Sequence, residues 1–365
     1  MRALHAYGAK ALEAVDDQVE RLRSMQGQTN TEPVVSREED HMKAIVQNEY
    51  GSADVLKFED VENPHVSENE VLVRMHAAGS GPDVWHLMTG QPYMARPVIG
   101  FRKPKVRVRG WDVAGTVEVV GAAVTGFKPG DEVMGFASSG SFAEFAVVPV
   151  NKLAMKPASL SFEEAAAVPI AGTTGFRAVR EAADVKPGQK VLIVGAAGGV
   201  GSFAVQFAKA FGAEVTGVAS TSKLDLVRSL GADDVIDYTR QDFTAGARRW
   251  DVIIDTAGRR PLSQLRRALS PKGTLVIVGG DGGGPVTGGF FRGVLRAPLV
   301  SLFVGQKLMA LSTKERAEDL RAVSELIDAG KVKPVIDRTY PLIEAADAVR
   351  YLAEGHPRGK IVITV

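Results

Sequence analysis

The segment at residues 190–219 constrains the fold more than any other part of the sequence. It opens with an uninterrupted apolar run at 191–194, which is typical of a strand buried on both faces of a sheet. A glycine-rich turn follows, and then apolar residues recur at helical spacing up to Gly212, which predicts the end of a helix. A second apolar strand at 214–219 completes the pattern. The segment therefore predicts a strand, helix and strand of a parallel sheet.

The turn between the first strand and the helix predicts a dinucleotide site. In the pattern G-x-G-x-x-G, the second glycine lets the backbone approach a pyrophosphate and the third lets helix and strand pack closely. Ala196, Gly198 and Gly201 occupy the three glycine places, so the first glycine is replaced by alanine. An ordinary glycine-rich turn is the alternative, but the flanking strands and the N–H groups at the helix start favour a diphosphate. The residues expected to contact the dinucleotide are Ala197, Gly198, Gly199 and Val200.

The end of the second strand favours NADP over NAD. An NAD site usually has Asp or Glu there to bind the ribose hydroxyls, but this chain has Ala219 followed by Ser220, Thr221 and Lys223. Hydroxyl groups and a cation suit a 2′-phosphate, and Tyr238 at the end of the next strand adds another donor. The alternative is that Ser220 or Thr221 only caps a helix and Lys223 faces water.

Composition excludes several classes of protein. The 365 residues carry 44 Lys and Arg against 43 Asp and Glu, so no broad basic surface for nucleic acid is expected. The apolar stretch at 290–304 is interrupted by Arg292, Arg296 and Pro298, so no membrane span is expected. The sequence has no cysteine, which removes disulfides, thiolate nucleophiles and cysteine-ligated zinc.

The chain divides into four predicted parts. Residues 1–41 are expected to form an amphipathic helix and a linker, and their acidic residues argue against a presequence and for a cytoplasmic protein. Residues 42–160 are β-rich, with strands at 43–47, 56–61, 70–77, 113–120, 132–136 and 142–148. Residues 161–310 open with a capping box at Ser161 and alternate helices with strands, the last strand being expected at 299–304. Residues 311–365 contain helices at 312–329 and 344–354 and a closing strand at 360–365 that returns to the first domain.

This order of parts, together with five short motifs, resembles the medium-chain dehydrogenase/reductase superfamily over residues 42–365. Besides the glycine turn, the motifs lie at 110–117, 127–133, 230–233 and 358–362. They are similar to those of the zinc-free quinone-oxidoreductase branch, including its reticulon-interacting mitochondrial members. The resemblance implies an α/β fold with a β-rich GroES-like catalytic domain and a doubly wound Rossmann domain. It also implies a homodimer and NADP contacts at Thr174, Gly279 and Lys360.

Several departures from the family pattern concern the metal and the substrate contacts. Gly81 stands where zinc alcohol dehydrogenases of the superfamily carry a catalytic cysteine, and Trp111 and Asp112 stand where they carry histidine and glutamate. Many zinc-free relatives have asparagine before the proline that is Pro82 here, and their aspartate follows one place later than Asp83. The resemblance therefore implies a zinc-independent enzyme whose polar contacts to substrate differ from those of its relatives.

Without a metal, the chemistry expected is hydride transfer from NADPH to an acceptor that is already electron-poor. A quinone or an α,β-unsaturated carbonyl compound fits, because its negative charge delocalises onto oxygen. Trp85, Tyr93 and Phe136 are candidates for an apolar wall around a flat substrate, and Tyr93 is also a candidate donor to the developing oxyanion. Ordinary packing is the alternative for Trp85 and Phe136, and for Tyr93 the alternative is an anchor of a surface loop. Asp112 is a candidate proton relay, or it pairs with an arginine.

Two other functions are left open. An enoyl-thioester reductase would have a long apolar channel with a basic mouth, for which the candidates are Arg102, Lys103, Lys105, Arg107 and Arg109. A protein that binds NADPH without catalysis would have its substrate cavity filled by side chains such as Trp85 or Trp111. His76, His86 and His356 are scattered singly, so no metal site is predicted.

Overall fold

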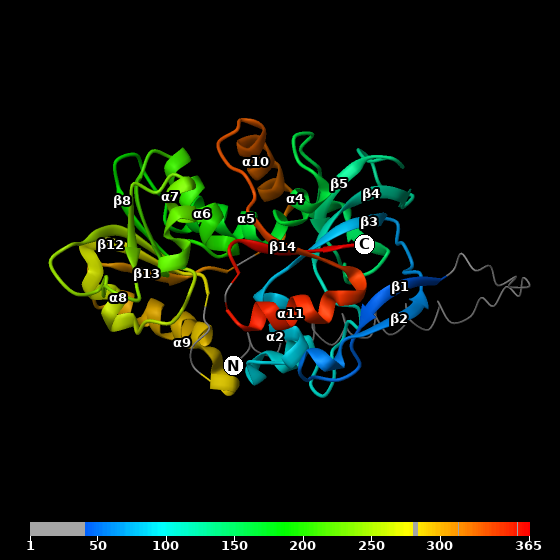
Figure 1. Ribbon diagram of the computed structural model, residues 1–365, viewed down its shortest axis with the longest axis horizontal. Helices are drawn as coiled ribbons and strands as arrows, with labels where there is room; N and C mark the ends of the chain where they lie inside the picture. The colour runs from blue at the N-terminus through cyan, green and yellow to red at the C-terminus, as the bar shows by residue number, and fades with distance from the viewer. Residues whose placement is uncertain (1–40, 280–283, 313, 356) are drawn as a thin grey trace, which may run out of the picture. The chain divides into compact units, whose positions relative to one another are not determined.

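Two large sheets organise the chain, one mostly antiparallel and one fully parallel (Figure 1). The structure is a computed structural model that describes residues 41–279, 284–312, 314–355 and 357–365. Residues from His41 onward form one unit. The helix and linker predicted at residues 1–41 lie outside the described residues, apart from His41. His356 also lies outside them.

The first sheet has seven strands and corresponds to the β-rich half of the sequence. Its strand order is β14-β15-β3-β4-β5-β7, with β6 paired to β3, and a separate hairpin joins β1 to β2. The strands are β1 (His41–Val46), β2 (Lys57–Glu62), β3 (Glu70–Ser80), β4 (Asp112–Val120), β5 (Glu132–Phe136), β6 (Phe145–Pro149), β7 (Leu153–Met155), β14 (Ile336–Pro341) and β15 (Lys360–Thr364). Alternate residues of β3, including Val71, Val73 and Met75, are buried in the core of this sheet. This alternation is typical of strands with one face against a core.

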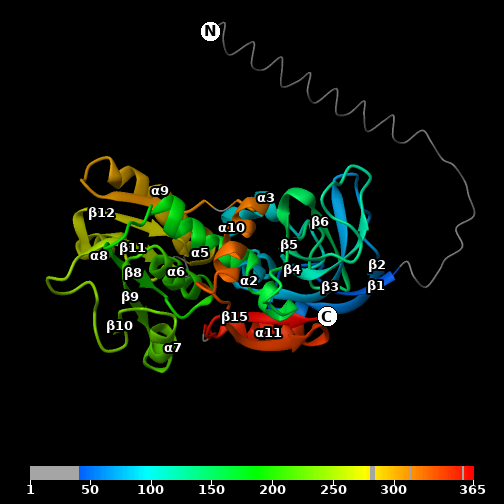
Figure 2. The ribbon, with the colours of Figure 1, turned by 90° about the horizontal axis from the view of Figure 1, so that it is seen from above.

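The second sheet has six parallel strands in the order β10-β9-β8-β11-β12-β13, and Figure 2 shows β10, β9, β8, β11 and β12 following one another. The strands are β8 (Lys190–Val194), β9 (Glu214–Ala219), β10 (Asp234–Asp237), β11 (Trp250–Asp255), β12 (Leu269–Ile277) and β13 (Lys307–Ala310). From β8, the chain first builds the sheet outward to β9 and β10, and then returns to add β11, β12 and β13 on the other side of β8. This arrangement is typical of a doubly wound dinucleotide-binding fold, and its direction reverses between β8 and β11.

Helices cover both faces of the parallel sheet. In Figure 1, α6 and α7 lie on one side of it and α8 and α9 on the other. Ile193 of β8 belongs to the core on the α6 side, whereas its neighbour Leu192 belongs to the core that includes Leu265 of α8. The uninterrupted apolar run of β8 therefore serves two cores, as expected for a strand buried on both faces.

The helices differ in how regular they are, and only some begin where the sequence predicted. The helices are α2 (Pro82–Thr89), α3 (Arg96–Ile99), α4 (Phe162–Ala166), α5 (Pro169–Arg177), α6 (Gly199–Ala210), α7 (Leu224–Ser229), α8 (Leu262–Ala268), α9 (Gly284–Ser301), α10 (Ala317–Asp328) and α11 (Ala345–Ala353). The capping box predicted at Ser161 is present, because Ser161 and Glu164 bond each other's backbone N–H groups. Helix α10 begins five residues later than predicted.

The strand predicted at 299–304 is wrong. Residues up to Ser301 belong to α9, which consists of two helical pieces on either side of Gly288 (φ 60°, ψ 161°). The sixth strand is β13, which pairs with β12 from Lys307 onward. Leu302 and Phe303 are 77% and 86% exposed, whereas Val300 and Val304 pack against the core that includes Leu265, so this apolar stretch covers the sheet without joining it. Apolar content alone did not identify the strand that completes the sheet.

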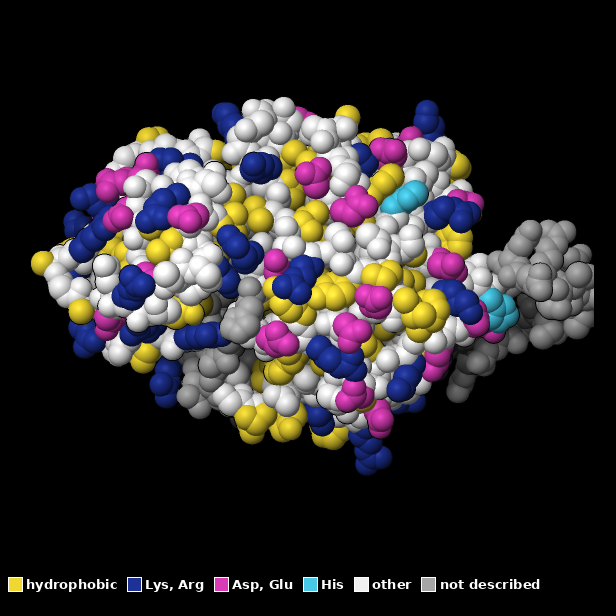
Figure 3. All heavy atoms as spheres, viewed as in Figure 1, with side chains coloured by type: hydrophobic (Ala, Val, Ile, Leu, Met, Phe, Trp, Pro, Cys, Tyr) yellow, Lys and Arg dark blue, Asp and Glu magenta, His cyan; other side chains and the backbone are white. Residues whose placement is uncertain are grey.

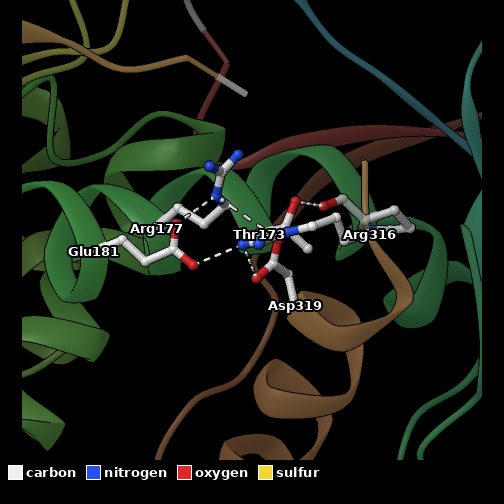
Figure 4. A network of polar contacts seen from close by, with 6 residues as sticks. Thr173, Arg177, Glu181, Arg316 and Asp319 are labelled. Atoms are coloured by element: carbon white, nitrogen blue, oxygen red, sulfur yellow. Dashed lines mark hydrogen bonds and ion pairs between the residues drawn. The ribbon is translucent and has the colours of Figure 1, made fainter. Parts of the chain in front are cut away.

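A network of charged side chains joins α10 to α5 (Figure 4). Nε of Arg177 donates to Glu181 over 3.0 Å and lies 3.7 Å from the buried carboxylate of Asp319. Arg316 donates to both Glu181 and Asp319, at 2.7 and 2.9 Å. Burial raises the pKa of Glu181, but hydrogen bonds from Arg177 and Arg316 outweigh that effect and the pKa lies below its usual value. The network fixes α10 on the helix that supports the cleft described below.

Charges on the surface are mixed. Figure 3 shows Lys, Arg, Asp and Glu side chains interspersed over one face, in keeping with the nearly equal totals of basic and acidic residues. Among the described residues, no helix is long and apolar enough to cross a membrane.

Candidate functional site

A cavity of about 660 Å³ lies between the carboxyl ends of β8 and β9 and the start of α2. The parallel sheet contributes the glycine turn and the ends of its strands, and the antiparallel sheet contributes Ser80, Gly81 and the first turns of α2. The segment at 357–360 closes one side. The cavity thus lies where the strand order of the parallel sheet reverses, the usual ligand site of such folds.

The glycine turn has the geometry that a diphosphate requires. Gly195 has φ 80°, and α6 begins at Gly199 after the N-cap Gly198, which has no side chain to bond the free N–H groups. A β-carbon on Gly201 would stand 2.1 Å from the carbonyl oxygen of Gly195, so glycine is required there by packing. A β-carbon on Gly198 would meet nothing nearer than 3.5 Å, and it would occupy the cavity instead. This open cradle at a helix start fits the diphosphate of a dinucleotide.

The adenosine end of the cavity contains the residues predicted for NADP. Ser220, Lys223 and Tyr238 all line it, and Nζ of Lys223 donates to the carbonyl oxygen of Pro357 over 3.1 Å. Burial lowers the pKa of Lys223, Asp337 opposes this, and nearby Arg358 and Arg259 lower it further. Several cations therefore act on one end of the cavity, which suits a phosphate.

One predicted donor is engaged elsewhere. The hydroxyl of Thr221 donates to Asp237 over 2.5 Å, and the same carboxylate accepts hydrogen bonds from the backbone and side chain of Thr239. These bonds lower the pKa of Asp237. Among the described residues of β9 and β10, Asp237 is the only carboxylate at the carboxyl end of a strand. Its hydrogen bonds are made within the protein, and it does not line the cavity.

Sequence reasoning missed Arg259 and Arg260, which also line the cavity. Arg260 lies 3.3 Å from Asp242 and over the ring of Phe243. The signal was present, because both arginines follow β11, and the carboxyl ends of parallel strands meet at one edge of the sheet.

A buried ion pair borders the other end of the cavity. Nζ of Lys360 donates to Oδ2 of Asp112 over 2.8 Å, and the two side chains are only 5% and 1% exposed. Oδ1 of Asp112 accepts the backbone N–H of Ile170, also at 2.8 Å. Lys360 lines the cavity, whereas Asp112 does not, and the contact of Lys360 with NADP stays a prediction. The predicted arginine partner of Asp112 is wrong, since the partner is a lysine.

The segment from β3 into α2 supplies the rest of this end. Ser80, Asp83, Trp85 and His86 line the cavity, and Nδ1 of His86 lies 2.9 Å from the carbonyl oxygen of Gln91. Neither Oγ of Ser80 nor Oδ1 of Asp83 has a hydrogen-bond partner among the described residues, although both atoms are shielded from solvent. Burial raises the pKa of Asp83 to about 6, Lys360 opposes this, and Asp112 adds to it.

The other aromatic candidates lie outside this cavity. Tyr93 lines a separate cavity of about 570 Å³, where the guanidinium of Arg96 stacks on its ring. Trp85 borders both cavities. Phe136 is 1% exposed in the core between the sheets, so its alternative assignment as a packing residue holds.

Two predicted cofactor contacts do not line the cavity. Thr174 is buried in α5, the helix that also provides Ile170 and Ala171 to the cavity wall. Gly279 follows β12, and a β-carbon there would stand 2.1 Å from the carbonyl oxygen of Thr256, which does line the cavity. Contacts of Thr174 and Gly279 with a cofactor stay predictions.

The basic run does not form a mouth to this cavity. None of its five members lines the cavity. Arg109 is buried, and Arg107 bonds Asn48 and lies 3.8 Å from Glu59. Within the described part of the chain, no group of three His, Cys, Asp or Glu side chains could hold a metal ion.

Comparison with known proteins agrees with this architecture. Residues 67–158 match the family model described as alcohol dehydrogenase GroES-like domain, and residues 230–363 match the one described as zinc-binding dehydrogenase. The 2-methylene-furan-3-one reductase of Solanum lycopersicum is 36% identical over 336 residues, which is 88% of this chain and 79% of that protein. The chain belongs to the medium-chain dehydrogenase/reductase superfamily. Within it, the chain is similar to quinone-oxidoreductase-like members.

Two further relatives of this medium-chain dehydrogenase/reductase are informative. The chloroplastic NADPH-dependent alkenal/one oxidoreductase of Arabidopsis thaliana is 34% identical over 336 residues, covering 88% of this chain and 79% of that protein. The solved structure of the quinone oxidoreductase from Coxiella burnetii is 30% identical with a TM-score of 0.77, and the match covers 89% of this chain and 99% of that one. The GroES-like and Rossmann-type parts predicted from the sequence are thereby confirmed.

Proposed function

We propose that this chain is an NADPH-dependent oxidoreductase that transfers hydride to a quinone or an α,β-unsaturated carbonyl compound. The observation that supports it is one open cavity that runs from Lys223 and the glycine turn to Ser80, Asp83 and Lys360. The names of the relatives in Arabidopsis thaliana, Solanum lycopersicum and Coxiella burnetii point to the same acceptor class.

The residues of this chain would hold NADP along the cavity. Gly198 leaves room for a diphosphate at the start of α6, and Ser220, Lys223 and Tyr238, which line the cavity, would bind the 2′-phosphate. Bound there, NADPH would supply the hydride. The side chains from β3 and α2 would orient the acceptor, exclude water around it and provide the proton.

The proposed reaction is independent of zinc. The sequence has no cysteine, and Gly81 and Trp111 replace the cysteine and histidine that the zinc enzymes of the superfamily use. Glycine and tryptophan offer no side chain that zinc prefers as a ligand. An acceptor that is already electron-poor does not require a Lewis acid.

Two alternatives have less support. A binding protein without catalysis was expected to have its cavity filled by Trp85 or Trp111, but Trp85 borders an open cavity and Trp111 does not line it. An enoyl-thioester reductase was expected to have a basic mouth, and the basic run does not line the cavity. Both remain outcomes of the assay below.

The assay follows NADPH absorbance with a panel of quinones, enones and enoyl thioesters, with NADH in parallel. Lys223→Met removes the cation expected at the 2′-phosphate, and a hydrogen bond to a charged group contributes about 1.5–3 kcal/mol. KM for NADPH should rise by roughly 10- to 150-fold while KM for NADH stays nearly constant. Lys186→Met is the matched control, because Lys186 is exposed and pairs with Asp184. Equal losses with both cofactors would contradict the assignment of Lys223.

We also infer a homodimer that works in the cytoplasm. The homodimer is carried over from the zinc-free relatives. Light scattering on the purified protein tests the first, and imaging of a fluorescent fusion tests the second. Relatives named as chloroplastic make an organelle the competing outcome.

A further inference from the structure

The corner of the cavity beside Lys360 contains two polar atoms that no described residue pairs. Oγ of Ser80 and Oδ1 of Asp83 are shielded from solvent, and neither has a hydrogen-bond partner among the described residues. Both residues line the cavity. A buried polar atom without a partner costs about 1–3 kcal/mol, so these atoms indicate a polar group of a ligand that would bond them.

Asp83 also has an unusual charge environment. A β-carbon on Gly81 would stand 2.5 Å from Oδ1 of Asp83 and 3.5 Å from Nζ of Lys360, so these two atoms lie within about 6 Å of each other. Lys360 is already neutralised by Asp112 at 2.8 Å. The corner therefore contains one ammonium and two carboxyl groups, and such a cluster favours retention of one proton.

We propose that Asp83, in its protonated form, donates the proton that completes reduction of the acceptor. This assignment rests on the proposed function. The carbonyl oxygen of the acceptor lies at the corner formed by Ser80 and Asp83, where it satisfies the two unpaired atoms. Sequence position alone did not assign this role, because Asp83 stands one place before the aspartate of the relatives.

The step balances as follows for an α,β-unsaturated ketone. Hydride from NADPH forms a C–H bond at the β-carbon, and the electrons of the C=C bond shift to leave an enolate oxygen. The O–H bond of Asp83 breaks and its proton passes to that oxygen, so the enolate becomes an enol that reverts to the ketone. The carboxylate of Asp83 regains a proton from water. The acceptor, NADPH and one proton thus give the reduced product and NADP.

The charged groups around Asp83 set the pH at which it can act. Burial favours its neutral form and raises its pKa to about 6, Lys360 favours the charged form, and Asp112 and Glu315 favour the neutral form. His86 lies one turn further along α2 and is the other titratable group of that helix at the cavity. Since the acid must be protonated to donate, the rate should fall as the pH rises through this pKa.

The experiment compares Asp83→Asn, Asp83→Glu and His86→Asn with the wild-type enzyme. At saturating NADPH and a fixed enone, wild-type kcat should fall about tenfold per pH unit above the pKa of Asp83. Asp83→Asn should lower kcat by roughly 10²- to 10⁴-fold and abolish this descending limb. Asp83→Glu should restore the limb at a shifted pH, which shows that the site still folds, and His86→Asn should retain it.

The protonation of Asp83 can also be measured in the protein without cofactor, independently of its activity. Infrared difference spectra of the cofactor-free protein, taken between about pH 5 and pH 8, should show a protonated carboxyl band that disappears with rising pH and is absent from Asp83→Asn. A wild-type limb that survives in Asp83→Asn, or is lost in His86→Asn, would overturn the assignment of Asp83 but not the proposed function. If wild-type protein reduces no quinone or enone, the proposed function fails, whatever the infrared titration shows.

Discussion

Removing either partner of the ion pair between Asp112 and Lys360 should destabilise the protein, and the loss should be larger when Lys360 is removed than when Asp112 is removed. Both side chains are at least 95% buried, their charged atoms are 2.8 Å apart, and Asp112 also accepts the N–H of Ile170. Removing one partner of a buried ion pair typically costs about 3–5 kcal/mol, because the other charge is left unpaired in the interior.

Lys360→Met should be the more damaging change. It leaves Asp112 and Asp83 near each other with no cation between them, so the full cost of about 3–5 kcal/mol applies. After Asp112→Asn, the carboxylate of Asp83 is still near Lys360 and partly compensates its charge. The new amide oxygen can still accept the N–H of Ile170. The cost of Asp112→Asn should therefore be about 1–3 kcal/mol, the penalty for a weakened buried hydrogen bond.

Thermal unfolding of the cofactor-free protein measures these losses. At roughly 2.1 cal/mol/K per residue, the unit from His41 to Val365 has an unfolding entropy of about 0.7 kcal/mol/K. Tm should then fall by about 4–7 °C for Lys360→Met and about 1–4 °C for Asp112→Asn.

The double variant decides whether the pair itself is responsible. Asp112→Asn combined with Lys360→Met removes both charges, so its Tm should lie above that of Lys360→Met alone. If the two losses instead add, the coupling between the residues is negligible and the reasoning from burial is refuted.

Other predictions concern the glycine turn and the network on α10. Gly201→Ala should lower Tm by about 1–4 °C in a thermal scan, because its β-carbon would stand 2.1 Å from the carbonyl oxygen of Gly195. Gly198→Ala should leave Tm unchanged but raise the Kd for NADPH at least tenfold in a fluorescence titration, and equal effects of the two variants would contradict the geometry. Asp319→Ala leaves the buried guanidinium of Arg177 less compensated, so calorimetry should show a loss of about 2–4 kcal/mol, and a neutral result would mean that solvent already screens it.

The parts of the fold that depend on neighbouring residues could be predicted from the sequence. The unit β8-α6-β9 was predicted because its apolar periods, its glycines and the end of its helix all lie within thirty residues. The capping box at Ser161 was predicted for the same reason. Ser220, Lys223 and Tyr238 were predicted to line the site because strand ends of a parallel sheet share one edge.

The parts that depend on distant partners could not be predicted. Asp112 and Lys360 are 248 positions apart, so nothing in the sequence around either residue identifies the other. That Oδ1 of Asp83 has no hydrogen-bond partner among the described residues is visible only once β3, β4 and β15 are placed together. The strand predicted at 299–304 failed because α9 continues to Ser301 and Leu302 and Phe303 are exposed, and the more polar β13 completes the sheet by pairing with β12.

The segment at 357–360 completes one side of the cofactor crevice. Gly359 donates its N–H to the carbonyl oxygen of Ala197, and the carbonyl oxygen of Pro357 accepts from Lys223, which is 134 positions earlier. Both contacts join parts of the chain that are at least 134 positions apart. The crevice is therefore complete only when residues 357–360 lie beside the glycine turn, so a coenzyme would find its whole binding surface only where these distant segments have come together.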